Sequence, residues 1–151
     1  MKKNLYLFVV LFTLSSFSQN DGKRLINFNL ENKIAILGYD PVAYFKQNKA
    51  LKGKKELIAI YQGVEYHFSS VANKELFLKT PTAFEPQFGG WCAYAMGNSG
   101  EKVEINPETF KIIDGKLYLF YNAYFTNTLK SWNKDEAILK KKAEANWKKI
   151  Y

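Results

Sequence analysis

This sequence has little cysteine, histidine, methionine and proline: its 151 residues include one Cys, one His, two Met and four Pro. A single cysteine cannot form a disulfide within the chain, and it excludes a multi-cysteine zinc site. We also find no Ser-His-Asp arrangement, phosphate-binding loop or dinucleotide-binding fingerprint. These absences remove the common enzyme signatures, and the sequence does not predict an enzyme.

A long hydrophobic run is also missing. The longest, Leu5–Leu14, has ten residues, whereas a membrane-spanning helix needs roughly 20. It follows Lys2 and Lys3 and precedes the small residues Ser16 and Ser18, the pattern of a cleaved export signal. We therefore predict a signal peptide over residues 1–18 and a periplasmic or secreted protein without stable membrane insertion after cleavage. The alternative is an uncleaved anchor helix.

Acidic residues are outnumbered, since the chain carries a formal net charge of +8. Loss of Lys2 and Lys3 with the signal would leave +6. Most remaining lysine clusters lie near the C-terminus, where we expect a solvated helix face, and an exported protein is not expected to bind nucleic acid.

Apolar residues make up 47% of the chain and aromatic residues 17%, enough to form a core. We predict an irregular N-terminal arm over residues 19–35, which docks through Leu25, Ile26 and Phe28, and one domain over residues 36–151. The fold class is α+β, with small antiparallel hairpins and about five short helices.

Local signals place several elements. Asp40 before Pro41 is a helix cap, and Ser69 or Ser70 caps a second helix. Asp114-Gly115 is a hairpin turn, and the apolar faces of 116–121 suggest a central strand. Further expected elements are strands over 57–61, 64–69, 102–105 and 110–113, helices over 71–79, 91–96 and 125–132, and a C-terminal helix with an apolar stripe of Leu139, Ala143, Trp147 and Ile150.

Cys92 is the first candidate for chemistry. Gly89-Gly90 introduces the helix in whose first turn we place it, and free N–H groups there would stabilise a thiolate. Met96 follows one turn later on the same face. Cys, Met and a nearby His are ligands suited to copper, especially Cu(I). The alternative is that Cys92 and Met96 are core-filling side chains.

His67 lies on the strand face opposite Val64, Tyr66 and Phe68, so it could meet a cavity, another layer or solvent. It could help Cys92 to hold a metal, act as a base for it, or be structural. A pocket with a polar rim is a further candidate, with the core of an aromatic-rich domain as the alternative; its lining would be Tyr39, Asp40, Tyr44, Tyr66, Trp91 and Tyr94.

The chain resembles the YHS domain, named for a Tyr-His-Ser pattern that corresponds here to Tyr66, His67 and Ser69. It is most similar to the exported, stand-alone members. The matching segments are GYDPVAYF (38–45), YQGVEYHF (61–68), FGGWCAYAM (88–96), DGKLYLFYN (114–122) and KAEANW (142–147).

The resemblance implies metal binding, with copper as the metal, because related segments occur in copper-transporting ATPases. In the stand-alone members the position of Cys92 sometimes holds selenocysteine, which implies a redox-active or metal-bound group. The cysteine pair of the related TRASH pattern is missing after Phe68.

Three hypotheses follow. The protein binds a soft metal, copper, through Cys92 with His67 or Met96; it is a thiol redox protein that uses Cys92; or it is a module that binds a small molecule or a protein partner without catalysis.

Overall fold

Six α-helices and three small β-sheets form residues 16–151, the part of the chain that this computed structural model describes, with side chains described from Asp21 onward. The expected α+β class is confirmed. The helices are α1 (Ser16–Asn27), α2 (Pro41–Gln47), α3 (Val71–Lys79), α4 (Ala93–Asn98), α5 (Thr128–Trp132) and α6 (Glu136–Ile150).

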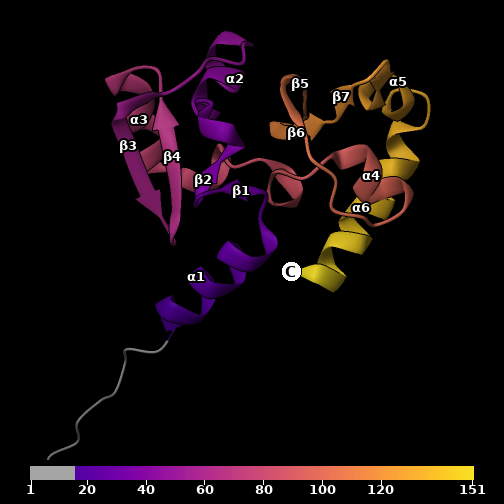
Figure 1. Cartoon of the computed structure of the whole chain (residues 1–151), viewed down its shortest axis with the longest axis horizontal. Helices are drawn as coiled ribbons and strands as arrows, with labels where there is room; N and C mark the ends of the chain where they lie inside the picture. The colour runs from indigo at the N-terminus through magenta and orange to yellow at the C-terminus, as the bar shows by residue number, and fades with distance from the viewer. Residues whose placement is uncertain (1–15) are drawn as a thin grey trace, which may run out of the picture.

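The largest sheet has four strands in the order β1-β2-β4-β3, in which β2 runs parallel to β4 and the other pairs are antiparallel. Figure 1 shows this sheet with α2 and α3 at one end of the molecule and α4, α5 and α6 at the other. The strands are β1 (Leu30–Glu31), β2 (Ile34–Ala35), β3 (Lys54–Tyr61), β4 (Val64–Phe68), β5 (Asn106–Ile113), β6 (Lys116–Phe120), β7 (Asn122–Ala123) and β8 (Thr126–Asn127); the 3-10 turns are η1 (Ile36–Gly38), η2 (Pro81–Ala83) and η3 (Gln87–Gly90).

The predicted caps are confirmed. The Asp40 carboxylate accepts hydrogen bonds from the backbone of Val42 and Ala43 at the start of α2, and Ser70 caps α3. A carboxylate or hydroxyl at this position satisfies N–H groups that have no partner within the helix. Asp114-Gly115 connects β5 to β6 as expected.

Strand β6 separates two hydrophobic clusters. Leu117 and Leu119 belong to the cluster that includes β4 and α3, whereas Tyr118 and Phe120 belong to the cluster that includes Trp132 and α6. Both faces are buried although, among the described strands, β6 pairs with β5 alone; Leu117 makes one further isolated bridge, to Pro86. The prediction of a central strand was therefore wrong: helices and loops, rather than further strands, cover its two faces.

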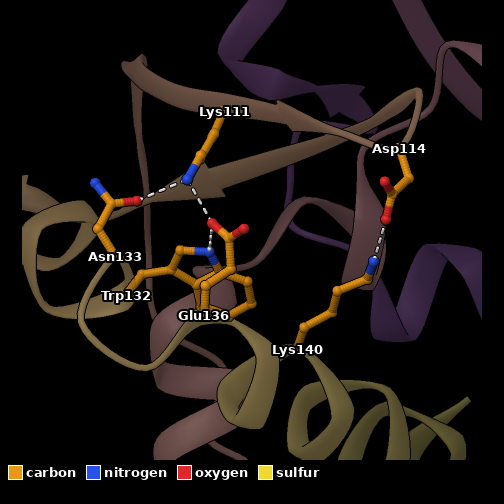
Figure 2. A network of polar contacts seen from close by, with 6 residues as sticks. All are labelled: Lys111, Asp114, Trp132, Asn133, Glu136 and Lys140. Atoms are coloured by element: carbon orange, nitrogen blue, oxygen red, sulfur yellow. Dashed lines mark hydrogen bonds and ion pairs between the residues drawn. The ribbon is translucent and has the colours of Figure 1, made fainter.

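Helix α6 packs through its expected stripe, with Leu139 and Ala143 buried and Trp147 and Ile150 against the second cluster. Polar contacts add to this packing (Figure 2): Glu136 accepts from Lys111 and from the Trp132 indole, and Lys140 donates to Asp114. The hydrogen bond from Lys140 lowers the pKa of the Asp114 carboxyl. These contacts hold α6 against the β5–β6 hairpin.

Three local predictions were also wrong. The helix expected over 125–132 begins only at Thr128, because Thr126–Asn127 form β8 and pair with β7. Residues 19–35 are not an irregular arm, because they contain α1 and two strands of the main sheet. From Asp21 onward, Arg24 is the one buried residue of α1, at 4% exposure, whereas Ile26 is 77% exposed. Residues 102–105 form no strand, although the Val103 carbonyl accepts a hydrogen bond from Cys92.

The predicted export signal falls mainly on residues that lie outside the described part of the chain. None of the helices between Ser16 and Tyr151 has the length and apolar composition that a membrane-spanning segment needs.

Candidate functional site

His67, on β4, borders a pocket of about 190 Å³, which we call the His67 pocket. The other walls come from β1, β2 and the turn η1 that follows β2, and from the segment that enters β3. The side chain of His67 is only 9% exposed. Side chains alternate between the two faces of β4, so His67 lies on the face opposite the buried Tyr66 and Phe68, as predicted. The pocket is lined by Glu31, Ile34, Leu37, Gly38, Lys52, Gly53, Lys55 and His67.

The imidazole of His67 is fixed on one side. Its Nε2 lies 2.6 Å from Oε1 of Glu65, two residues earlier on the same strand face. Its Nδ1 lies beside Gly38, where a Cβ atom would be 3.3 Å away. Nδ1 has no hydrogen bond within the described part of the chain. A carboxylate therefore orients the ring, and the other nitrogen is left for a ligand or a proton.

Two glycines make room for this ring. A Cβ on Gly53 would lie 2.4 Å from the Cβ of His67, a distance that side chains do not tolerate. Gly53 donates its N–H to the Gly38 carbonyl at 2.9 Å. The segment before β3 thus lies directly over His67, and any larger residue at position 53 would push it away.

The backbone beside the pocket is strained. Ile36 and Leu37 have φ of 52° and 51° and precede Gly38 at 78°. The left-handed conformation costs a residue with a side chain roughly 1–2 kcal/mol, and such strain is concentrated at functional sites. Burial of Ile36, at 3% exposure, offsets part of this cost. Leu37 and Gly38 both line the pocket, so the strain lies at its wall.

The lining of the His67 pocket has more cations than anions. Lys52 and Lys55 line it with a single carboxylate, Glu31, and the nearby Glu65 is already paired with His67. Lys52 donates to the Leu37 carbonyl and lies 4.8 Å from the centre of the Tyr39 ring. The pocket therefore combines an imidazole nitrogen with a positive rim.

Cys92 lies in very different surroundings. Its side chain is fully buried, and Sγ receives the backbone N–H of Tyr121 at 3.3 Å and lies 3.4 Å from the Thr128 hydroxyl. Cys92 is the N-cap of the six-residue α4 rather than part of its first turn, and its own N–H donates to Val103. The thiol is thus part of the core.

Met96, His67 and Cys92 share no contact among side chains. Met96 is fully buried in the second cluster, Cys92 belongs to the first, and His67 contacts Glu65, Gly38 and Gly53. Within residues 16–151 no group of three or more His, Cys, Asp or Glu side chains is placed to hold a metal ion.

Several of the six residues expected to line a pocket have contacts within the fold. The Tyr44 hydroxyl donates to Pro107 at 2.9 Å, and the Trp91 indole donates to Asn27 at 2.6 Å. Burial raises the pKa of Tyr44 well above its ordinary value. None of the six lines the His67 pocket or the Arg24 pocket described next; they are Tyr39, Asp40, Tyr44, Tyr66, Trp91 and Tyr94.

A larger pocket of about 450 Å³, the Arg24 pocket, lies between η3 and α6, with Phe28, Glu85 and Trp147 in its wall. Beside it, Arg24 donates to Glu85 and to the Tyr66 hydroxyl, which itself donates to Glu85. Burial acts to lower the pKa of Arg24, but the hydrogen bond and charge of Glu85 outweigh it and raise the pKa. The Arg24–Glu85 ion pair is thus formed within the fold, although Nε of Arg24 is buried without a hydrogen-bond partner in the described part of the chain.

The sequence pointed to His67 but not to its partners. Glu65 lies on the same predicted strand face, which was a usable signal. Gly53, Lys52 and Lys55 lie in a lysine-rich segment that reads as an exposed loop, and no local pattern shows that it covers His67. No pattern in the sequence indicated that Arg24 would be buried.

No protein-family model matches this chain, and comparisons with the curated proteins and with the solved structures found no similar protein.

Proposed function

We propose that this protein is an exported, YHS-like binding module without catalysis, and that it holds a small organic acid in the His67 pocket. The observation that carries the proposal is the imidazole itself: Glu65 fixes Nε2, and Nδ1 lies beside Gly38, which lines the pocket together with His67. An anchored ring of this kind presents one nitrogen in a defined direction, as ligand-binding histidines do.

The chemistry of the pocket favours an anion. A protonated ring donates Nδ1–H to a carboxylate while Glu65 balances its charge, and Lys52 and Lys55 add attraction at the rim. The volume of about 190 Å³ equals roughly six water molecules. That space suits an acid of a few carbon atoms, and Ile34 and Leu37 supply an apolar wall for its body.

Binding fits better than catalysis because the lining lacks a hydroxyl or thiol nucleophile for the imidazole to activate. No Ser, Thr or Cys is among the eight lining residues, so the imidazole has no hydroxyl or thiol to activate there.

The test uses the single histidine of the chain. Its ring signals in a proton–carbon NMR spectrum report the pocket without ambiguity while acetate, propionate or lactate is added at constant pH and ionic strength. We expect a saturable shift of these signals, and no heat of binding to the His67→Gln variant by calorimetry.

Lys55 and Lys54 provide a matched pair, because both are exposed lysines on β3 and only Lys55 lines the pocket. Lys55→Met should weaken binding by about two- to fivefold, the range for an exposed charge pair, and Lys54→Met should not. Equal effects, or no saturable shift with any acid, would contradict the proposal.

Soft-metal binding remains a second candidate. The Cys92 sulfur accepts the backbone N–H of Tyr121, and both cysteine sulfur and imidazole nitrogen are copper ligands. Because Cys92 is fully buried, this reading and a thiol redox role both require the core to open. Titration with Cu(I) under reducing conditions decides it: stoichiometric binding that Cys92→Ser abolishes would favour copper, with Met96→Leu and His67→Gln testing the other ligands.

We infer an extracytoplasmic location, periplasmic or secreted, from the predicted signal over residues 1–18. The mass of the protein recovered from the periplasm or medium tests it, with Gln19 expected as the first residue.

A further inference from the structure

Tyr124 and Phe125 form the turn between β7 and β8, and we call them the aromatic turn. Their side chains are 89% and 113% exposed, the two highest values among the exposed large hydrophobic residues of the described chain. The flanking residues Asn122–Ala123 pair with Thr126–Asn127, so the turn is the tip of a short hairpin. Both rings project away from the fold.

The backbone of this turn does not suit these residues. Tyr124 and Phe125 have φ of 49° and 64°, and a two-residue hairpin turn with both φ values positive favours Asn, Asp and Gly. Two other hairpins follow this preference at the second position, with Gln62-Gly63 and Asp114-Gly115. A third, Asn32-Lys33, has Asn at the first. Only the aromatic turn, among these four, has neither.

Burial explains two other apolar residues that have positive φ, whereas Leu37, also at positive φ, is half-buried in the wall of the His67 pocket. Ile36 and Phe88, with φ of 52° and 56°, are 3% and 4% exposed, so packing offsets their strain. Tyr124 and Phe125 gain no comparable packing. Backbone strain that no packing offsets indicates a functional role. Because both side chains are exposed, we expect that role to be contact with another molecule.

We propose that the aromatic turn binds reversibly to the surface of an anionic lipid membrane. Two side chains at a tip are far too few for a stable protein interface, which buries about 800 Å² on each partner. A bilayer surface needs no shape complementarity, and Tyr suits its boundary because one end of the side chain is apolar and the other polar. Phe125 enters the acyl region beside it.

The charge around the turn fits this partner. Helix α5 follows β8 directly, and it brings the exposed Lys130, with Lys134 just beyond. No acidic residue occurs from Tyr121 to Lys134. Lysines next to inserted aromatic residues attract anionic headgroups, so the attachment is peripheral and depends on salt.

The experiment is co-sedimentation with vesicles of phosphatidylcholine alone or mixed with phosphatidylglycerol. The protein is recovered after export and its mass checked, because the apolar run Leu5–Leu14 would itself bind lipid. We expect binding to the mixed vesicles, weaker binding to phosphatidylcholine, and a loss of about tenfold or more in the double variant Tyr124→Asn/Phe125→Gly, as expected when interfacial apolar area is removed.

This double variant gives the turn its preferred residues, so it should fold at least as well as the original chain. Ile60→Thr is the control, since it removes another exposed apolar side chain, 69% exposed on β3, and should not change binding. Absence of vesicle binding, or unchanged binding of the double variant, overturns the proposal; the second result would assign the binding to lysine charge alone.

Discussion

Cys92 and His67 are each the only residue of their type, yet they lie in different surroundings. His67 retains a ring nitrogen at the edge of a pocket, whereas the sulfur of Cys92 accepts a backbone N–H inside the first core cluster. Rarity in the sequence identified both as candidates. Only the tertiary structure distinguishes them, because burial depends on segments remote in the chain.

The surroundings of Cys92 predict an inert thiol. In the native protein it should react with a thiol reagent only as fast as the fold opens, because the side chain is fully buried. The rate should rise to that of a free cysteine in denaturant, which absorbance of the released thiolate measures. Rapid labelling without denaturant would contradict this placement.

Substitution at Cys92 should separate packing from hydrogen bonding. Cys92→Ala leaves the Tyr121 N–H without an acceptor and should cost about 1–3 kcal/mol of unfolding free energy, as urea denaturation measures. Cys92→Ser retains an acceptor for that N–H, and a smaller loss would show that the hydrogen bond matters.

The buried tyrosines predict a loss of stability in alkali. Burial raises the pKa of Tyr44 and Tyr66 above the ordinary value of 10.0. The folded state therefore keeps its phenolic protons where the unfolded chain loses them. This contribution is complete below about pH 10 and is lost as the pH rises above it toward the folded-state values. Urea unfolding across this range should show the decline, with a shallower slope in Tyr44→Phe.

At the scale of elements, local signals predicted most of what was found. Asp40 before Pro41, Asp114-Gly115 and the stripe on α6 each specify an element through their own residues. Helix α1 was not predicted, because Arg24 docks it through contacts with residues far away in the chain. A strand over 102–105 was predicted wrongly, because Val103 instead accepts a hydrogen bond from Cys92, which no local pattern shows.

Asp40 should be among the most sensitive positions, because it caps α2 and joins it to α3. Its Oδ1 accepts from Val42 and Ala43, and its Oδ2 accepts from Ser69 and from the Asn73 amide. Asp40→Ala leaves these donors without an acceptor and should lower the free energy of unfolding by about 3 kcal/mol or more.

Ser70→Ala is the comparison for Asp40, because Ser70 caps only α3. It should cost about 1 kcal/mol in the same denaturation experiment. Equal losses in the two variants would show that Asp40 acts only as a cap.

At the scale of the whole molecule, Arg24 attaches α1 to the rest of the fold. Its guanidinium pairs with Glu85, contacts the Tyr66 hydroxyl and lies 4.4 Å from the centre of the Phe28 ring. Arg24→Met would leave Glu85 largely buried without its cation, and should cost about 3 kcal/mol. Hydrogen exchange should then become faster across α1.

Lys23→Met, at the exposed neighbour of Arg24, is the control and should change little. In a double-mutant cycle, Arg24→Met with Glu85→Gln should cost less than the sum of the single changes. Additive losses would mean that the ion pair does not couple α1 to the η2–η3 segment.

The outer edge of the main sheet has a consequence for behaviour at high concentration. Strand β3 is unpaired on one side; it begins with Lys54, Lys55 and Glu56, and its register shifts before Ile58. Charged side chains and an irregular register at an exposed strand discourage one copy from adding to the next. Neutralising both lysines should therefore promote fibrous aggregation during refolding, even if each native molecule retains its shape.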